Sequence, residues 1–253
     1  MLEILQISEN GLRSNQEWLN TISHNIANIQ TPGFKKTMLN FGELVSTSAH
    51  AQPSDASNEF RGMGVSIESS IIDSKMGDIK STGKPLDVAI TGNGFLEVEL
   101  ENGDYAYTRL GKLSINDDGK LIMQNGLTLS SDINIPANAK NILINQSGIV
   151  SVQMDNTDDA VEVGQLALVK FAAPEFLHAM GGELFTANER SGQPEKIIDQ
   201  PGNGFMQGFI EMSNVDLIGE MSDLMMAQRA YQLNARLIQT ADQILETINN
   251  LRR

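Results

Sequence analysis

The two ends of the chain carry the periodicity of long helices. Between residues 214 and 253 there is no proline, and apolar or small side chains recur at alternating steps of three and four. This spacing predicts a helix that packs against other helices along one seam. Asp216 is the expected N-cap, and Arg252 and Arg253 lie where the helix dipole favours cations. The expected seam residues are Met221, Leu224, Gln228, Tyr231, Ile238, Leu245 and Ile248.

One step of this seam is short, because Ala241 follows Ile238 after three residues where four are due. Such a step is a stammer, which overwinds a coil locally. A second apolar line at Leu237, Ile244 and Leu251 widens the apolar face. Ordering this backbone costs about 1 kcal/mol per residue. The apolar face of so long a helix therefore needs a partner.

Residues 2–29 repeat the helical pattern at the other end of the chain. Ser8 and Asn15 interrupt their seam, and polar residues on a seam weaken it but fix register and partner number. The helix is expected to stop near Gln30, because Pro32 and Gly33 follow. The expected seam residues are Leu5, Leu12, Leu19, Ile22, Ile26 and Ile29.

The middle of the chain changes from helical to alternating periodicity. Residues 31–64 are predicted to be an extended, irregular connector, since the run 46–58 is rich in small and polar residues. From 65 to 213, short alternating runs separated by Asn-Gly, Asp-Gly and Ser-Gly pairs predict a β-rich domain. The runs 115–121 and 144–150 are similar, and they predict two related hairpins.

These patterns predict an α+β fold in which long N- and C-terminal helices of coiled-coil type flank an inserted all-β domain. Residues 1–30 and 214–253 are expected to form one helical domain, 31–64 the connector and 65–213 the outer β domain. The simplest way to cover both apolar stripes is to pair the helices with each other and with neighbouring copies. Contacts that do not close on themselves generate a helical filament.

Composition and charge narrow the function classes. The chain has 253 residues, no cysteine and a net charge of −14, of which residues 37–213 carry −13. No basic patch is available to replace the counterions of nucleic acid, so nucleic-acid binding is disfavoured. No apolar run is long enough for a membrane span, and the N-terminus lacks the basic region and apolar core of a signal peptide. We therefore expect no membrane span and no cleaved leader.

Signals of catalysis or cofactor binding are weak. His24, His50 and His178 are scattered and lack metal-ligand spacing. No G-x-S-x-G elbow is present, and the Gly-Asn-Gly pairs at 92–94 and 202–204 lack the later glycine of a dinucleotide loop. The run 116–119 hints at a calcium loop but lacks its closing glutamate. We expect no enzyme activity, no metal and no cofactor.

Motifs in five segments together resemble the bacterial flagellar rod and hook protein family. Residues 24–35 (HNIANIQTPGFK) are similar to the N-terminal signature of that family. Residues 86–95 (LDVAITGNGF) and 107–111 (YTRLG) resemble its central β-domain motifs. Residues 208–215 and 227–234 (AQRAYQLN) resemble the approach to its last helix and its C-terminal signature. The resemblance covers nearly the whole chain and is strongest to the distal-rod branch.

The resemblance implies a structural subunit of the distal rod, the drive shaft of the flagellar basal body. Such subunits leave through the flagellar type III export machinery, without signal cleavage, and polymerise in the periplasm into a hollow helical tube around the export channel. The implied partners are further copies, other rod proteins, the hook protein and the L/P ring proteins. A proximal-rod or hook-type axial protein is the alternative. A non-polymerising binding module and a cell-wall-degrading enzyme are further alternatives.

The resemblance also implies a helix-break motif after the N-terminal helix. Its side chains either satisfy backbone groups at a junction or form an ordinary C-terminal cap and turn. Gln228, Arg229 and Tyr231 likewise either contact neighbouring copies or are a solvated face and a core tyrosine. The motif residues are Asn25, Asn28, Thr31, Pro32, Gly33 and Phe34.

Overall fold

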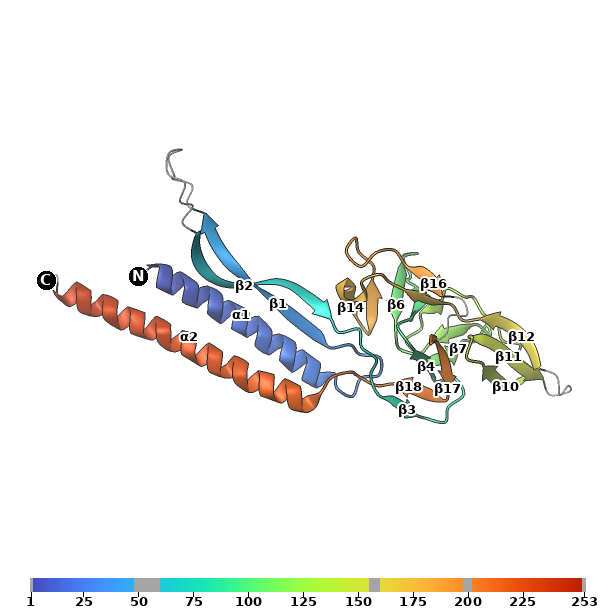
Figure 1. Ribbon diagram of the computed structural model, residues 1–253. Coiled ribbons are helices and arrows are strands. Elements are labelled where there is room, and N and C mark those ends of the chain that lie inside the picture. Colours follow the sequence, from blue (N-terminus) through green and yellow to red (C-terminus); the bar gives the residue numbers. More distant parts are fainter. Residues whose placement is uncertain (1, 48–59, 155–159, 198–201, 252–253) are drawn as a thin grey trace. The chain divides into compact units, whose positions relative to one another are not determined.

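The computed structural model describes residues 2–47, 60–154, 160–197 and 202–251 (Figure 1). The fold is α+β, as expected: an N-terminal helix, a mostly β middle and a C-terminal helix. The chain divides into two compact units, each assembled from segments distant in sequence. The first unit comprises Met1–Ala27, Thr37–Ile71 and Asp216–Arg253, and the second comprises Asn28–Lys36 and Ile72–Val215.

The first unit is built on two helices, α1 (Leu2–Ala27) and α2 (Leu217–Leu251). They lie side by side and antiparallel, so that the N- and C-terminal ends of the chain lie at the same end of the pair (Figure 1). The carboxylate of Asp216 accepts hydrogen bonds from the backbone N–H groups of Ile218 and Gly219, both at 3.2 Å. This confirms the predicted N-cap, whereas Arg252 and Arg253 lie outside the described residues.

α1 ends at Ala27, three residues before the predicted end at Gln30. A turn replaces the last helical residues, because the N–H of Thr31 donates to the carbonyl of Asn28 at 3.1 Å. The approaching Pro32 disfavours helical backbone at the residue before it.

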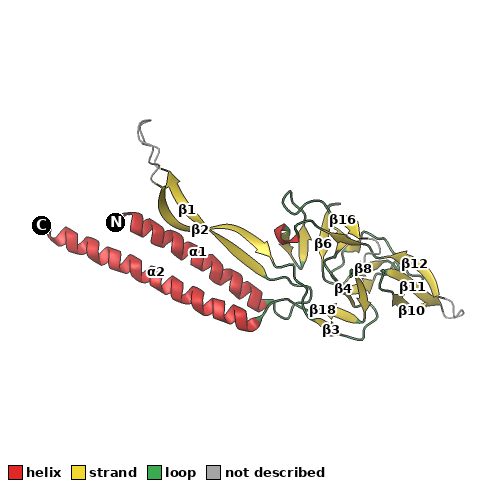
Figure 2. Cartoon of the chain, viewed as in Figure 1, coloured by secondary structure: helices red, strands yellow, loops and turns green. Residues whose placement is uncertain are grey.

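Much of the expected irregular connector forms strands. β1 (Thr37–Thr47) and β2 (Phe60–Ile72) pair as a two-stranded sheet, drawn in yellow in Figure 2. Most of the small, polar run that motivated the connector, residues 48–59, lies outside the described residues. α1 supports this sheet: Trp18 packs edge-on against Phe41, with ring centroids 5.9 Å apart. An isolated two-stranded sheet is only marginally stable in water. The local sequence therefore did not predict these strands.

The second unit contains the remaining strands. Its largest sheet has the order β14-β15-β6-β5-β9-β8-β7, and β13 joins β5 to β16. A three-stranded sheet has the order β10-β11-β12, and two further pairs are β17-β4 and β18-β3. A short 3₁₀ helix spans Pro174–Phe176. The strands are β3 (Ile79–Ser81), β4 (Val88–Thr91), β5 (Phe95–Glu99), β6 (Tyr105–Thr108), β7 (Leu113–Ile115), β8 (Leu121–Met123), β9 (Thr128–Leu129), β10 (Ala139–Ile144), β11 (Ile149–Met154), β12 (Ala160–Gln165), β13 (Leu168–Lys170), β14 (His178–Gly181), β15 (Leu184–Thr186), β16 (Glu195–Ile197), β17 (Gly204–Gln207) and β18 (Phe209–Glu211).

The two related hairpins are confirmed, in β7–β8 and β10–β11. In each turn an asparagine side chain accepts a hydrogen bond from a backbone N–H four residues later at 2.8 Å: Asn116 from Lys120, and Asn145 from Ile149. The glycine between them has a positive φ, 80° at Gly119 and 82° at Gly148. The Asp-Gly and Ser-Gly pairs therefore act as turns for the predicted reason, because glycine adopts this backbone without strain.

The segment 204–211 forms two short strands. Gly208, with φ at 80°, separates β17 from β18, which pair with different strands.

The core of the second unit is formed by side chains from its strands and the loops between them. Its fully buried side chains are large and apolar: Val88, Ile90, Leu96, Val98, Leu121, Met123 and Val150.

Candidate assembly surface

Small and polar side chains take part in the contact between α1 and α2. On α2 the covered positions lie seven residues apart, and Ala227 and Ala241 are buried. Gly11 of α1 lies so close to α2 that a Cβ added there would be 2.7 Å from Nδ2 of Asn234. Small residues permit this approach of the two backbones. The α1-facing stripe of α2 is Glu220, Ala227, Asn234 and Ala241.

Within the single chain, two buried positions of α2 lie one residue before the first and third residues of the predicted seam. Met221 and Gln228 are exposed, and the residue one position earlier is buried in each case. The predicted seam contains large apolar side chains, whereas the buried apolar residues of α2 are Ala227 and Ala241. Of the other α2 seam residues, Leu224 and Ile238 are half-buried. Tyr231, Leu245 and Ile248 are exposed, at 38%, 39% and 52%.

The α1 seam residues lie mostly at partly covered positions. Ile22 is buried, at 2% exposure. The polar interruption Ser8 is also buried, at 4%, and so is Ser14, whose hydroxyl donates to the carbonyl of Val65 in β2 at 3.2 Å. α1 is therefore covered on two sides, by α2 and by the β1–β2 sheet. The half-buried seam residues are Leu5, Leu12, Leu19, Ile26 and, beyond the end of α1, Ile29.

Asn25 joins three elements of the first unit. Its amide Nδ2 donates to the carbonyl of Thr37 at 2.9 Å, and its Oδ1 accepts from the N–H of Thr37 at 3.0 Å. The same Nδ2 donates to Oε2 of Glu220 at 3.2 Å. Asn25 and Glu220 are each 1% exposed. The end of α1, the start of β1 and the first turn of α2 are thus held by one buried amide.

The rest of the helix-break motif belongs to the second unit. The hydroxyl of Thr31 donates to the side-chain oxygen of Asn28 at 3.1 Å, and the N–H of Phe34 donates to the carbonyl of Thr31 at 3.3 Å. Gly33 has φ at 74°, and a Cβ there would lie 2.9 Å from the backbone N of Leu110. Pro32 is half-buried beside it. The position of Gly33 needs glycine both for its backbone and for the close approach of another segment.

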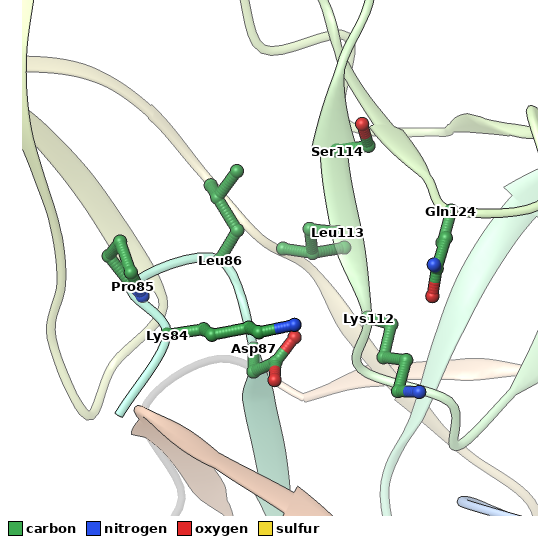
Figure 3. A pocket seen from close by; sticks show the side chains of 8 residues that line it. All are labelled: Lys84, Pro85, Leu86, Asp87, Lys112, Leu113, Ser114 and Gln124. Atoms are coloured by element: carbon green, nitrogen blue, oxygen red, sulfur yellow. The ribbon is translucent and has the colours of Figure 1, made fainter. Parts of the chain in front are cut away.

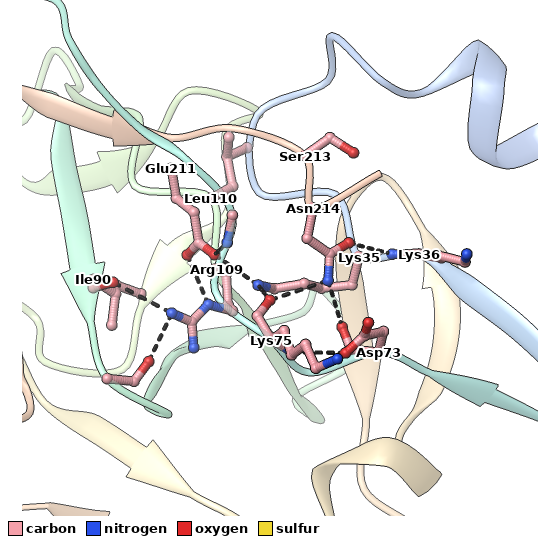
Figure 4. Close-up of polar contacts among 12 residues, drawn as sticks. Lys35, Lys36, Asp73, Lys75, Ile90, Arg109, Leu110, Glu211, Ser213 and Asn214 are labelled. Atoms are coloured by element: carbon pink, nitrogen blue, oxygen red, sulfur yellow. Dashed lines mark hydrogen bonds and ion pairs between the residues drawn. The ribbon is translucent and has the colours of Figure 1, made fainter. Parts of the chain in front are cut away.

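A buried ionic cluster follows this motif, formed by Lys35, Arg109 and Glu211 (Figure 4). Nζ of Lys35 lies 2.6 Å from Oε1 of Glu211, and Nε of Arg109 lies 2.8 Å from Oε2. The carboxylate also accepts from the N–H of Gly77 at 2.8 Å. Arg109 donates its remaining hydrogen bonds to the carbonyls at positions 90, 92 and 94. All three charged side chains are at most 2% exposed.

The electrostatics of the cluster are set by its burial. Loss of hydration lowers the pKa of Lys35 from 10.5 to about 8, and the positive charge of Arg109 acts in the same direction. Glu211 and, more weakly, Asp73 oppose this shift. Beside the cluster, Asn214 accepts from the N–H of Lys36 at 2.7 Å and donates to the carbonyls of Asp73 and Lys75.

This cluster was missed in the sequence. Its members stand in three of the motifs, but 74 and 102 residues separate them along the chain, and nothing in the sequence pairs them. The only available signal was a charged residue inside each otherwise apolar or glycine-rich motif. Three segments of the second unit, 33–36, 73–77 and 211–214, are tied together there.

The second unit also has a cavity of about 340 Å³ (Figure 3). Its charged side chains are Lys84, Asp87 and Lys112, and Ser114 is the hydroxyl in its lining. No histidine is among these described lining residues, so Ser114 has no partner there of the kind that activates a nucleophile. Across the described ranges, no group of three or more His, Cys, Asp or Glu side chains is placed to hold a metal ion. Neither described helix is long and apolar enough to cross a membrane.

Comparison with known families gives three matches in chain order. Residues 5–35 match the model of the flagella basal body rod protein family. Residues 89–152 match the D1 domain of the flagellar hook proteins FlgE, FlgF and FlgG. Residues 206–251 match the C-terminal region of the flagellar basal body rod proteins FlgE, FlgF and FlgG.

Curated relatives match over their full length. The flagellar basal-body rod protein FlgG of Buchnera aphidicola subsp. Baizongia pistaciae is 35% identical, over 99% of this chain and all of that protein. The FlgG protein of Borreliella burgdorferi is 35% identical over all of both chains. The flagellar hook-basal body complex protein FlhP of Bacillus subtilis is 32% identical, again over all of both chains.

Proposed function

Because the chain belongs to the FlgG-type family of flagellar basal-body rod proteins and is a structural subunit of that rod, we propose that its copies build the distal rod as a hollow helical tube. In this proposal the tube surrounds an export channel and transmits torque to the hook. The terminal helices form its inner wall by coiled-coil-type packing.

One observation carries the proposal: large apolar side chains on α2 are uncovered in the single chain. Met221, Leu233, Leu237 and Ile248 are all at least 52% exposed, and Leu251 is 83% exposed. Burying apolar surface contributes about 25 cal/mol per Å². An apolar face that runs the length of a helix is typical of an assembly interface and is a solubility liability otherwise.

Five of the predicted interface residues, all on α2, support such an assembly. Met221, Gln228, Tyr231, Leu245 and Ile248 are exposed and available to neighbouring copies. In the proposed rod, the acidic β-rich part, 65–213, forms the outer surface, toward the L/P ring proteins. The charge of −13 in residues 37–213 supports a solvated position for it.

The remaining partners are proposed from the family. Copies leave the cytoplasm through the flagellar type III export machinery without signal cleavage and polymerise within the periplasm. Other rod proteins and the hook protein join the two ends of the tube. The neutral balance of residues 1–36, with three acids and three bases, supports a packed position for the N-terminal helix.

Polymerisation of the purified full chain tests this function. Light scattering should rise above a threshold concentration, and electron microscopy should show straight hollow tubes. Curved tubes would favour a hook-type protein. A complex of fixed stoichiometry that does not grow with concentration would favour a binding module. Removal of residues 221–253 should leave a β-rich monomer that does not polymerise, and tubes formed by that truncation would refute the proposal.

A further inference from the structure

The cavity of the second unit is lined by charged side chains that have no partner among the described residues. Asp87 is only 8% exposed, yet no hydrogen bond or ion pair from those residues reaches its carboxylate. The ammonium groups of Lys84 and Lys112 are unpaired in the same sense. Figure 3 shows Lys84 and Asp87 reaching from one wall toward the segment that carries Lys112. Because buried polar groups are normally satisfied, this arrangement is typical of a binding site.

Other lysines of this unit are paired with carboxylates. Nζ of Lys120 lies 2.7 Å from Oδ1 of Asp132, and Nζ of Lys170 lies 3.2 Å from Oε2 of Glu195. Residues 37–213 have a net charge of −13, so carboxylates are in surplus around the cavity. Two lysines left unpaired beside one cavity therefore favour an anionic ligand from outside the chain.

Backbone hydrogen bonds fix the walls of the cavity. The N–H of Asp87 donates to the carbonyl of Lys84 at 3.2 Å, and the carbonyl of Asp87 accepts from the N–H of Gly208 at 2.8 Å. The N–H of Leu113 donates to the carbonyl of Leu86 at 3.0 Å. The backbone that carries the charged groups is therefore in place before a ligand arrives, which lowers the entropic cost of binding.

The lining selects a peptide carboxylate as the ligand. No aromatic ring is among the described lining residues, so a nucleobase has no stacking partner there. The two lysines repel a metal cation, and the buried carboxylate of Asp87 repels a fully ionised phosphate. At about 30 Å³ for each water, the cavity of 340 Å³ has room for roughly eleven waters, or for the tip of a β-turn. Such a turn offers carboxylates to the lysines and a backbone N–H to Asp87.

The chain itself carries a matching turn, at the far end of the hairpin that lines the cavity. β7 and β8 are joined by residues 116–119, in which Asp117 and Asp118 are exposed and unpaired among the described residues. Five residues separate Lys112 from Asp117, about 17 Å of strand at ~3.3 Å per residue, so the turn does not reach the cavity of its own copy. A cavity and a turn at opposite ends of one hairpin fit head to tail. A contact of this kind leaves the array of copies open.

We propose, resting on the rod function above, that the β-rich units of neighbouring copies join head to tail through this hairpin. Asp117 and Asp118 enter the cavity of the next copy, and their carboxylates pair with its two lysines. The N–H of Asp117, which donates to no described residue of its own chain, donates to the carboxylate of Asp87 in the next copy. Because salt screens such ion pairs, part of the polymerisation free energy is lost at high ionic strength.

Reversing the charges on each side tests the contact in the full chain. The turn variant carries Asp117→Lys and Asp118→Lys, and the cavity variant carries Lys84→Glu and Lys112→Glu. Each variant alone brings like charges together and should raise the threshold concentration for polymerisation about tenfold. An equal mixture should polymerise within about twofold of the parent threshold, because every turn then finds a cavity of opposite charge. Unchanged thresholds in the single variants, or a mixture no better than either variant, would overturn the inference.

A second acidic turn supplies the control for these changes. Glu101→Lys with Asp104→Lys reverses two exposed charges on the turn between β5 and β6, and it should leave the threshold within about twofold. Far-UV circular dichroism of each variant should match that of the parent chain. Lys84→Glu alone, at an exposed position, replaces the cavity variant if the double change lowers the β-sheet signal. An equal loss of polymerisation in the control would show that net charge, and not this contact, is responsible.

Cross-linking tests whether the turn of one copy meets the cavity of another. Because the chain has no cysteine, each single-cysteine variant reports one position. Copolymers of Lys84→Cys with Asp118→Cys should give mixed dimers with a short bismaleimide, and copolymers of Lys84→Cys with Glu101→Cys should not. Tubes without the mixed dimers would overturn the inference and leave the rod function standing. Failure of the parent chain to polymerise would refute the rod function, and the inference with it.

Discussion

In the first unit, α2 buries Ala227 and Ala241 beneath α1 and leaves Leu233 and Leu237 more than half exposed. In the second unit, large apolar side chains fill the core, since Leu121 and Val150 are at most 1% exposed. The β-rich unit thus obtains its apolar burial from its own strands. The helical unit still exposes apolar side chains on α2. In the proposed rod, helices of further copies would bury them.

Each unit holds a buried carboxylate. Glu211 in the second unit is paired with two cations, Lys35 and Arg109. Glu220 in the first unit accepts a hydrogen bond from the amide of Asn25. Breaking a charge pair inside a low-dielectric core is costly. We therefore expect the second unit to tolerate a change at Glu211 poorly.

The largest effect is expected from Glu211→Gln. This change leaves Lys35 and Arg109 buried without their counter-charge, and breaking such a pair costs about 3–5 kcal/mol. Urea unfolding of the full chain should show the loss in the β-sheet signal. Glu195→Gln removes the exposed partner of Lys170 and serves as the control, with a small change expected. Equal effects at the two sites would contradict the buried-cluster interpretation.

A leucine pair tests the contrast in apolar burial. Leu121→Ala should destabilise the monomer by about 3 kcal/mol, because it opens a cavity in the core of the second unit. Leu233→Ala should change monomer stability by less than about 0.5 kcal/mol, because that side chain is 61% exposed. Polymerisation should respond in the opposite order, with Leu233→Ala the more harmful. Thermal unfolding below the threshold concentration and light scattering above it measure the two effects.

Asn25→Ala should destabilise the first unit by about 2 kcal/mol, since it removes one buried and two part-buried hydrogen bonds. Hydrogen exchange should accelerate at the C-terminal end of α1 and in the first turn of α2, and it should stay unchanged in β5 and β6. Asn20→Ala, on the exposed side of α1, is the matched control. Faster exchange throughout the chain would show that Asn25 does not act locally.

The smallest effect is the pH dependence from Lys35. Unfolded Lys35 holds its proton up to about pH 10.5, while the folded residue releases it near 8. Between these values the unfolded chain binds more protons, so the free energy of unfolding should rise with pH, on the order of 1 kcal/mol from pH 8 to 9. Lys35→Met should remove this rise. A decline in the parent chain that disappears in the variant would contradict the assigned direction.

Local sequence predicted those parts of the fold that local physics controls. The turns at Gly119 and Gly148 follow from the backbone freedom of glycine, and the cap at Asp216 follows from the unsatisfied N–H groups of a helix start. The β1–β2 sheet was missed because α1 stabilises it. The buried stripe of α2 was not predicted, because it contains small residues such as Ala227 and Ala241 in place of the largest apolar side chains.

The sequence by itself determined that a long helix stands at each end of the chain and a β-rich region between them. Its motifs indicated the family. Periodicity, capping and turn chemistry depend on residues that are close together along the chain. They can therefore be predicted from the amino-acid sequence alone. Only the tertiary structure decided which stripe of α2 meets α1, and that Lys35, Arg109 and Glu211 share one site. These depend on which distant segments approach each other, and close approach selects small or charged side chains that no periodic pattern marks.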